Sequence, residues 1–122
     1  MVPVTLKDIR RRKAKRRREL AAALRSVRVQ LREMGALKIV VFGSFARNLV
    51  RSDSDLDLIS IMPATVSGRQ WMRRIYAEVE RGADCDILAY TPEELEATLP
   101  ASRFLRHALK TGRVIYERRS GA

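Results

Sequence analysis

The sequence contains one cysteine and one histidine among its 122 residues. A single cysteine, Cys85, cannot form an internal disulfide, and with only His107 beside it the chain lacks the ligand spacing of a zinc site. The longest uncharged apolar stretches, 39–44 and 58–68, are much shorter than the roughly 20 residues of a membrane-spanning helix. No apolar stretch near Met1 resembles a secretory signal peptide. We therefore expect a cytoplasmic protein that does not bind membranes.

Acidic residues are scarce at the start of the chain. Residues 1–32 contain 12 Lys and Arg but only two acids, whereas residues 33–122 carry an excess of only one positive charge. A cationic segment of this kind attracts polyanions through a screened field that does not depend on sequence. A solvated charged helix is the simpler interpretation, but eight like charges within Arg10–Arg18 exceed what solubility requires. Residues 7–32 are therefore a candidate binding segment for nucleic acid or an acidic partner.

A long helix is predicted at the N-terminus. Thr5 is a suitable N-cap, apolar residues then recur at spacings of 4, 3, 4 and 3 from Leu20 to Met34, and Gly35 suits the residue after a helix. We expect its second half to dock on the core and Arg10–Arg18 to project as a basic rod. The chain is accordingly divided into a basic N-terminal helix, residues 1–35, and a folded domain, residues 36–122.

The rest of the chain alternates strands with helices. Strands are predicted at 38–42, 55–62, 85–90 and 113–116, and helices at 44–49, 67–81, from Thr91 onwards, and at 102–111. This order is typical of an α/β (α+β) fold, in which helices flank a sheet.

Three features of this pattern indicate phosphate and metal chemistry. Gly43-Ser44 stands at a strand-to-helix turn, where glycine allows a phosphate close approach and the helix start offers free N–H groups. Asp55 and Asp57 lie on one face of a strand, and carboxylate oxygens suit Mg²⁺. Asp86 lies within a third, apolar strand, where a carboxylate needs a partner; if this strand neighbours the second, three acids surround one point. Asp84 shares its face and is the alternative third carboxylate.

These residues resemble the signature of a known family. Gly43-Ser44-Phe45-Ala46-Arg47, followed by Asp53-Ser54-Asp55-Leu56-Asp57-Leu58, is similar to the Gly-Ser-x-Ala-Arg-Gly … Ser-Asp-x-Asp-Leu pattern of minimal nucleotidyltransferases in the DNA-polymerase-β-like superfamily. Asp86-Ile87-Leu88 resembles the strand that carries the third carboxylate of that group. The chain departs from the pattern at Asn48, which replaces a glycine but tolerates a left-handed backbone.

The resemblance implies a nucleotidyltransferase fold, with a small mixed sheet flanked by helices and residues 36–122 as the catalytic domain. It implies Gly43, Ser44 and Arg47 as nucleotide-binding residues. It also implies a catalytic and metal-binding triad for Mg²⁺ or Mn²⁺, made of Asp55, Asp57 and Asp86.

The expected reaction is transfer of a nucleotidyl group, AMP from ATP or the equivalent from another NTP, to a hydroxyl acceptor. By resemblance the acceptor is a helical HEPN-type toxin, which gives the chain an antitoxin role; a homo-oligomer is the alternative partnership. The alternative function is a catalytically weak module that binds nucleotide, nucleic acid or protein through its basic helix.

Overall fold

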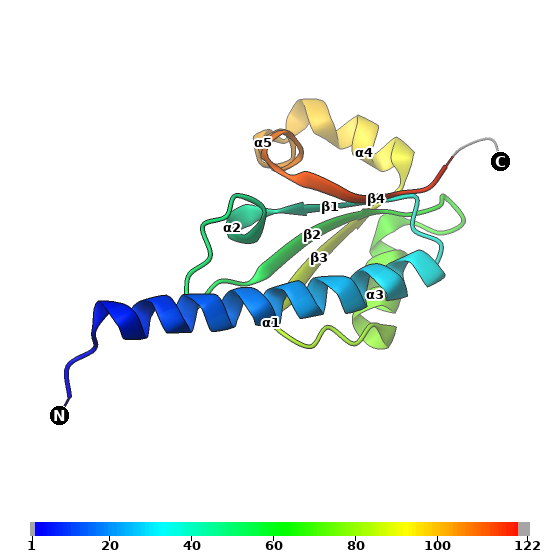
Figure 1. Ribbon diagram of the computed structural model, residues 1–122. Coiled ribbons are helices and arrows are strands. Elements are labelled where there is room, and N and C mark those ends of the chain that lie inside the picture. The colour runs from blue at the N-terminus through cyan, green and yellow to red at the C-terminus, as the bar shows by residue number, and fades with distance from the viewer. Residues whose placement is uncertain (1, 120–122) are drawn as a thin grey trace.

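The computed structural model describes residues 2–119, in which a four-stranded sheet lies between two helical layers (Figure 1). The helices are α1 (Leu6–Glu33), α2 (Gly43–Ala46), α3 (Gly68–Glu78), α4 (Pro92–Thr98) and α5 (Arg103–Thr111), with a short 3₁₀ helix η1 (Leu99–Ala101) after α4. The strands are β1 (Lys38–Phe42), β2 (Leu56–Ile61), β3 (Cys85–Tyr90) and β4 (Arg113–Glu117). The predicted α/β class, with a small mixed sheet and a long basic helix, is confirmed.

The strand order determines which strand ends meet. The order is β3-β2-β1-β4, with β1 antiparallel to β2 and to β4, and β2 parallel to β3. Because β1 runs against β2 and β3, the end of β1 lies at the same edge of the sheet as the starts of β2 and β3. The turn after β1 and the acids that begin β2 and β3 therefore share one edge.

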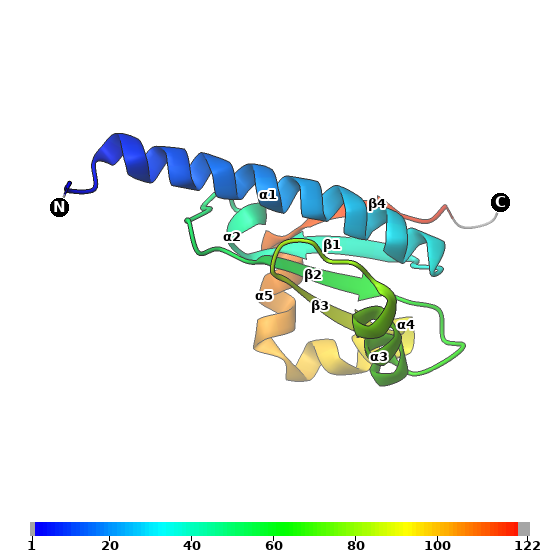
Figure 2. The same cartoon turned by 90° about the horizontal axis from the view of Figure 1, so that it is seen from below.

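Each face of the sheet buries its own apolar cluster. On one face, Leu56 and Leu58 pack with α1 and α3. On the other face, Ile59 and Ile61 pack with α5, as the alternation of a strand requires. Figures 1 and 2 show α1 crossing the first face along its length, while α4 and α5 cover the second face.

The long helix α1 joins the core through an apolar stripe at helical spacing. A Thr5–Asp8 capping box begins it, and Gly35 follows it with a φ of 104°. Four of its residues are buried: Leu20, Ala23, Val27 and Leu31. Among the described residues, no helix combines the length and apolar character needed to span a membrane.

Two helices are shorter than their predicted ranges. Helix α2 ends at Ala46 rather than at residue 49, because Asn48 adopts a left-handed φ of 60° that a right-handed helix cannot contain. Helix α3 ends at Glu78 rather than at residue 81. There the side-chain amide of Gln30 pairs with the backbone of Glu80, accepting from its N–H at 2.8 Å and donating to its carbonyl at 2.7 Å. This contact with α1 holds the chain in an extended course.

Candidate active site

Two of the three predicted acids lie side by side at the shared edge of the sheet. The Cα of Asp57 is paired with that of Phe42 on β1 and with that of Asp86 on β3. Phe42, Asp57 and Asp86 thus form one row across three strands. Side chains in such a row point to the same face, so both carboxylates emerge on the side covered by α5. Asp55 lies two residues before Asp57, at the mouth of β2.

Gly43 brings the first motif directly against this row. It begins α2 with a φ of 78°, and a Cβ at this position would lie 3.3 Å from the Asp57 carboxyl carbon and in closer conflict with a carboxylate oxygen. A side chain here would push this carboxylate aside and strain the backbone, so glycine suits the turn. Ser44 follows as a half-buried residue of α2, whereas Arg47 is exposed at the C-terminal end of this helix. The geometry unites Gly43 with the acids and leaves Arg47 at the periphery.

The surroundings of Asp57, the central acid of the row, disfavour its ionised form. Burial raises the pKa of Asp57 above its usual value, and the nearby carboxylates of Asp86 and Asp55 raise it further. A cation among these groups would relieve that repulsion. An open cavity of about 520 Å³ is lined by Asp55, Asp84 and Asp86 together with Arg81 and the rest of the loop before β3, whereas neither Asp57 nor Gly43 lines it. This volume is within the range of small-molecule sites.

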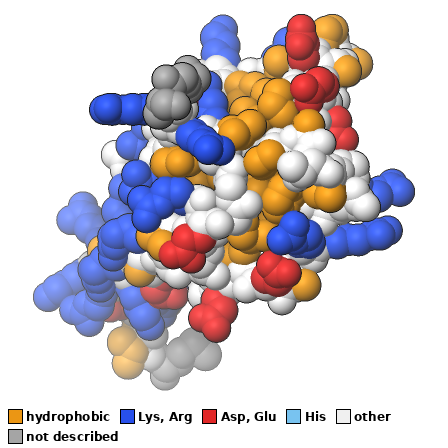
Figure 3. All heavy atoms as spheres, turned by 90° about the vertical axis from the view of Figure 1, so that its right-hand side faces the viewer, with side chains coloured by type: hydrophobic (Ala, Val, Ile, Leu, Met, Phe, Trp, Pro, Cys, Tyr) orange, Lys and Arg blue, Asp and Glu red, His pale blue; other side chains and the backbone are white. Residues whose placement is uncertain are grey.

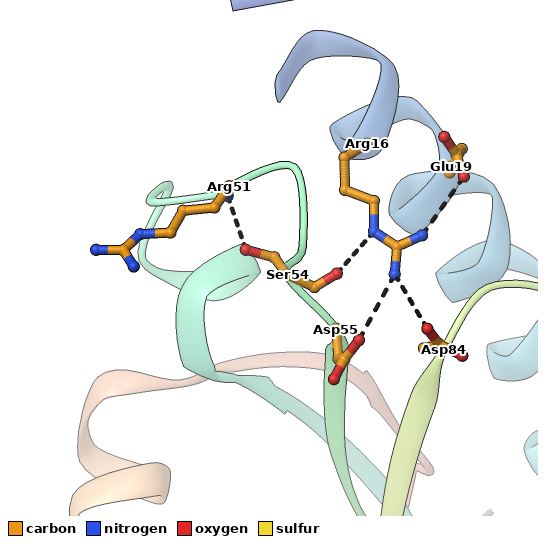
Figure 4. A network of polar contacts seen from close by, with 6 residues as sticks. All are labelled: Arg16, Glu19, Arg51, Ser54, Asp55 and Asp84. Carbon is orange, nitrogen blue, oxygen red and sulfur yellow. Dashed lines mark hydrogen bonds and ion pairs between the residues drawn. The ribbon is translucent and has the colours of Figure 1, made fainter. Parts of the chain in front are cut away.

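A side chain from α1 completes the mouth of the site. The Arg16 Nε donates to the Ser54 carbonyl at 2.7 Å, and one guanidinium nitrogen lies 3.6 Å from both Asp55 Oδ1 and Asp84 Oδ2 (Figure 4). Glu19 contacts the other terminal nitrogen at 3.4 Å. The Arg16 side chain is only 15 % exposed. Arg16 lies in the segment expected to project as a free rod, yet it is held against the candidate site.

Sequence reasoning gave Arg16 no role, although the helical period contains a signal for it. Arg16 precedes Leu20 by four residues, so it continues the buried stripe of Leu20, Val27 and Leu31 by one turn. Lys13 lies on the same stripe, but within residues 10–18 Arg16 is the cation that is not fully exposed. Extending the apolar face of the helix toward the N-terminus selects Lys13, Arg16 and Arg17 together, so the helical period narrows the basic run without separating Arg16 from the other two.

Three further polar or aromatic residues have no part in the row of acids. Ser54 is buried, and its hydroxyl accepts from the Arg51 N–H at 2.7 Å, a contact that caps the loop. Trp71 is buried in the core, with its indole N–H donating to the Pro63 carbonyl at 2.8 Å. His107 is exposed on α5.

The donor types at this edge fit a hard divalent cation, because carboxylate oxygens are the ligands that Mg²⁺ prefers. The arrangement itself is more open than a finished metal centre. Across residues 2–119, no three Asp, Glu, His or Cys side chains converge closely enough to enclose a metal ion. Asp57 and Asp86 are neighbours in the row, while Asp55 pairs with Arg16. Asp84 shares that arginine rather than the row.

Comparison with known proteins agrees with this geometry. The family model described as the nucleotidyltransferase domain matches residues 24–115, which is more than half of the chain. The chain therefore belongs to the nucleotidyltransferase domain family and is a transferase of that class. The match contains the glycine-serine turn and the acids Asp55, Asp57, Asp84 and Asp86, but not the part of α1 that carries Arg16 and Glu19.

A solved structure shares the fold. It is a provisionally assigned nucleotidyltransferase from Sulfolobus solfataricus, 12 % identical to this chain, with a TM-score of 0.59. The similarity covers 90 % of this chain and 91 % of that protein. At this identity the likeness bears on the fold alone. No curated protein matches the sequence.

Proposed function

We propose that the protein transfers AMP from ATP to a hydroxyl acceptor, with Gly43, Ser44 and the acids Asp55, Asp57 and Asp86 as its site. The observation that carries the proposal is the row in which Asp57 and Asp86 are paired across β2 and β3 beside Gly43. The family's chemistry is nucleotidyl transfer, and at this edge of the sheet a turn suited to phosphate lies beside paired carboxylates.

Each residue has a distinct task in this mechanism. The Gly43 turn and the Ser44 hydroxyl hold the triphosphate against the sheet edge. Asp86, exposed at the start of β3, accepts the proton of the acceptor hydroxyl as its oxygen attacks the α-phosphorus and pyrophosphate departs. Asp55, Asp57 and Asp86 would together hold Mg²⁺ or Mn²⁺, which when bound supplies positive charge to the phosphates. Asp57, whose pKa is raised by burial and by its neighbours, gains most from such a counter-charge.

The acceptor that we propose is a HEPN-type toxin, by resemblance to the minimal nucleotidyltransferases, with the present chain as its antitoxin. Transfer of label from ATP to a candidate HEPN-type partner in the presence of Mg²⁺ tests this assignment. A partner that stays unlabelled while the protein binds Mg-ATP would reject the acceptor and leave the nucleotide site standing.

The nucleotide site is tested by equilibrium binding of Mg-ATP. We expect Asp57→Asn to weaken binding at least tenfold, since it removes a carboxylate from the centre of the row. Asp53→Asn is the matched control, because Asp53 is an exposed loop acid outside the row. Equal affinities for the wild-type protein and Asp57→Asn would reject the site.

A second candidate function is a binding module with weak catalysis. The specific observation in its favour is the contact of Arg16 with Asp55, which places a resident cation on one of the proposed metal ligands. Such a module would bind its partner equally well with Asp57→Asn, and it would show no label transfer with any acceptor.

A further inference from the structure

A second cavity, of about 550 Å³, lies where the first half of α1 passes the loop that follows α2. Lys13, Ala14 and Arg17 line it from α1, and residues 48–51 line it from the loop. Three of these side chains, Lys13, Arg17 and Arg51, are cationic, and no acid lines the cavity. We refer to this feature as the basic pocket.

The charge of the basic pocket is not neutralised within the described chain. Every ion pair among residues 2–119 is made by Arg16, so Lys13, Arg17 and Arg51 have none there. Arg17 donates to the side-chain oxygen of Asn48, a neutral group. In Figure 4 the Arg51 side chain extends away from Arg16 and its carboxylates. Three like charges gathered around one cavity repel one another, and an anionic ligand would relieve that repulsion.

The basic pocket continues into a longer cationic row. Arg10 precedes Lys13 by three residues and Arg17 by seven, so the three share one face of α1 over about 10 Å at 1.5 Å per residue. Figure 3 shows Lys and Arg side chains gathered at its lower left, on the side where α1 lies. A row of one sign suits a polymer with regularly repeated charges better than a protein surface, on which both signs alternate.

The walls of the pocket favour a nucleotide unit over a bare anion. Leu49 is 58 % exposed and borders the pocket with Val50 and Ala14, which provides apolar surface beside the cations. A phosphate can lie on the cations while its sugar or base contacts this surface. A concave site of this size admits a splayed single strand, whereas a duplex presents its stacked backbone to a broader surface.

From these observations we propose that the basic pocket binds the phosphodiester backbone of single-stranded nucleic acid. This goes beyond the nucleotide site, and it uses a part of the chain that the family match does not include, since that match begins at residue 24. The two sites are nevertheless linked. Ser54 accepts from the Arg51 N–H at 2.7 Å through its hydroxyl and from Arg16 at 2.7 Å through its carbonyl, one residue before Asp55.

The test measures the affinity for a short fluorescein-labelled oligouridylate by anisotropy over a range of salt concentrations, without nucleotide or Mg²⁺. The pocket variant is Lys13→Gln/Arg17→Gln/Arg51→Gln. The control is Arg25→Gln/Arg28→Gln/Arg32→Gln, which removes three exposed cations from the second half of the same helix. We expect the pocket variant to lose at least tenfold in affinity and its salt slope to fall by about 2, from three lost phosphate contacts at roughly 0.7 each. The control should lose about threefold or less.

Several results would overturn the proposal. Equal losses in both triple variants would mean a diffuse field without a site, and a duplex that binds as tightly as the single strand would exclude a splayed strand. Competition by polyglutamate as effective as that by unlabelled oligouridylate would indicate an acidic protein partner instead. The charge-preserving variant Lys13→Arg/Arg17→Lys/Arg51→Lys should stay within about threefold of wild type. Asp57→Asn should bind the oligonucleotide normally, which keeps a failure here separate from a failure of the nucleotide site.

Discussion

The ionised carboxylate of Asp57 lies in surroundings that disfavour a negative charge. Burial and the carboxylates of Asp86 and Asp55 raise its pKa above the usual 3.8. Between 3.8 and this raised pKa, the folded protein binds the proton more readily than the unfolded chain does. Stability contributed at Asp57 is therefore lost as the pH rises through that interval, and the ionised group remains unfavourable at pH 7.

We predict that Asp57→Asn raises the free energy of unfolding at pH 7 by about 0.5–1 kcal/mol, because it removes one of two like charges directly opposite each other. The midpoint of thermal unfolding should rise by roughly 2–6 °C. Below pH 3.8 the gain should shrink, since the wild-type carboxyl is then protonated in both states. Asp53→Asn should show no such gain, and a loss of stability in Asp57→Asn at pH 7 would contradict the repulsion.

Gly43 leaves room for the Asp57 carboxylate because it has no Cβ. We predict that Gly43→Ala lowers Mg-ATP affinity at least tenfold, because its Cβ would displace the Asp57 carboxylate, and lowers the free energy of unfolding by about 1–2 kcal/mol through its φ of 78°. Gly35→Ala is the matched control. Gly35 has a φ of 104°, and its Cβ would have only an ordinary 3.6 Å contact with Pro63. It should lose stability but keep the affinity; equal losses of affinity would remove the steric argument.

At the scale of elements, Arg16 holds the first half of α1 to the strand edge. Its hydrogen bond to the Ser54 carbonyl is charge-assisted and largely shielded from water. Because such bonds contribute about 1.5–3 kcal/mol, Arg16→Ala should lower the free energy of unfolding by roughly that amount in urea titration. Arg18→Ala, at an exposed neighbour with no hydrogen bond or ion pair in the described chain, should change it by less than about 0.5 kcal/mol. Similar effects at the two positions would mean that Arg16 does not anchor the helix.

The sequence pattern predicted the start or end of a helix well where residues close to it in the chain determine that position. Helix α4 begins after Thr91 as expected, and a capping box of Thr91 and Glu94, three residues apart, fixes this start. The premature end of α3 could not be foreseen in the same way. It depends on Gln30, whose amide meets the backbone 50 residues further along the chain. Contacts of that separation leave no periodic trace in a sequence.

The same division applies to the candidate site. The spacing of Asp55 and Asp57 was enough to place both acids at the start of one strand, although β2 itself begins only at Leu56, and the strand pairing then brought Asp86 beside Asp57. Of the two candidates for the third carboxylate, the register places Asp86 in the row and an ion pair places Asp84 beside Arg16, and neither fact could be obtained from the sequence. Arg16 lies on helix α1, and the composition of that helix indicated only that it is basic.

At the scale of the whole molecule, Cys85 reports how firmly the layers close over the sheet. Its side chain belongs to the cluster between the sheet and the layer formed by α1 and α3, and it is 4 % exposed. Burial, above all, raises the pKa of this thiol to about 12 from 9.0. Because only the thiolate reacts, at pH 8 the folded protein presents about a thousandfold less nucleophile than the unfolded chain.

Alkylation of Cys85 by iodoacetamide should therefore follow transient opening of the layers. We predict that at pH 8 the native protein reacts at least about a thousandfold more slowly than the urea-unfolded protein, with the rate rising as urea populates the open form. The raised pKa of Cys85 also makes the stability of the fold depend on pH. Above pH 9 the unfolded chain releases the thiol proton and the folded chain retains it, so stability should fall by about 1 kcal/mol per pH unit toward pH 12. Cys85→Ala lacks this contribution but shares every other titration, so the difference between the two pH profiles isolates it. Fast alkylation of the native protein, or parallel profiles, would mean that the layer of α1 and α3 is not closed over β3.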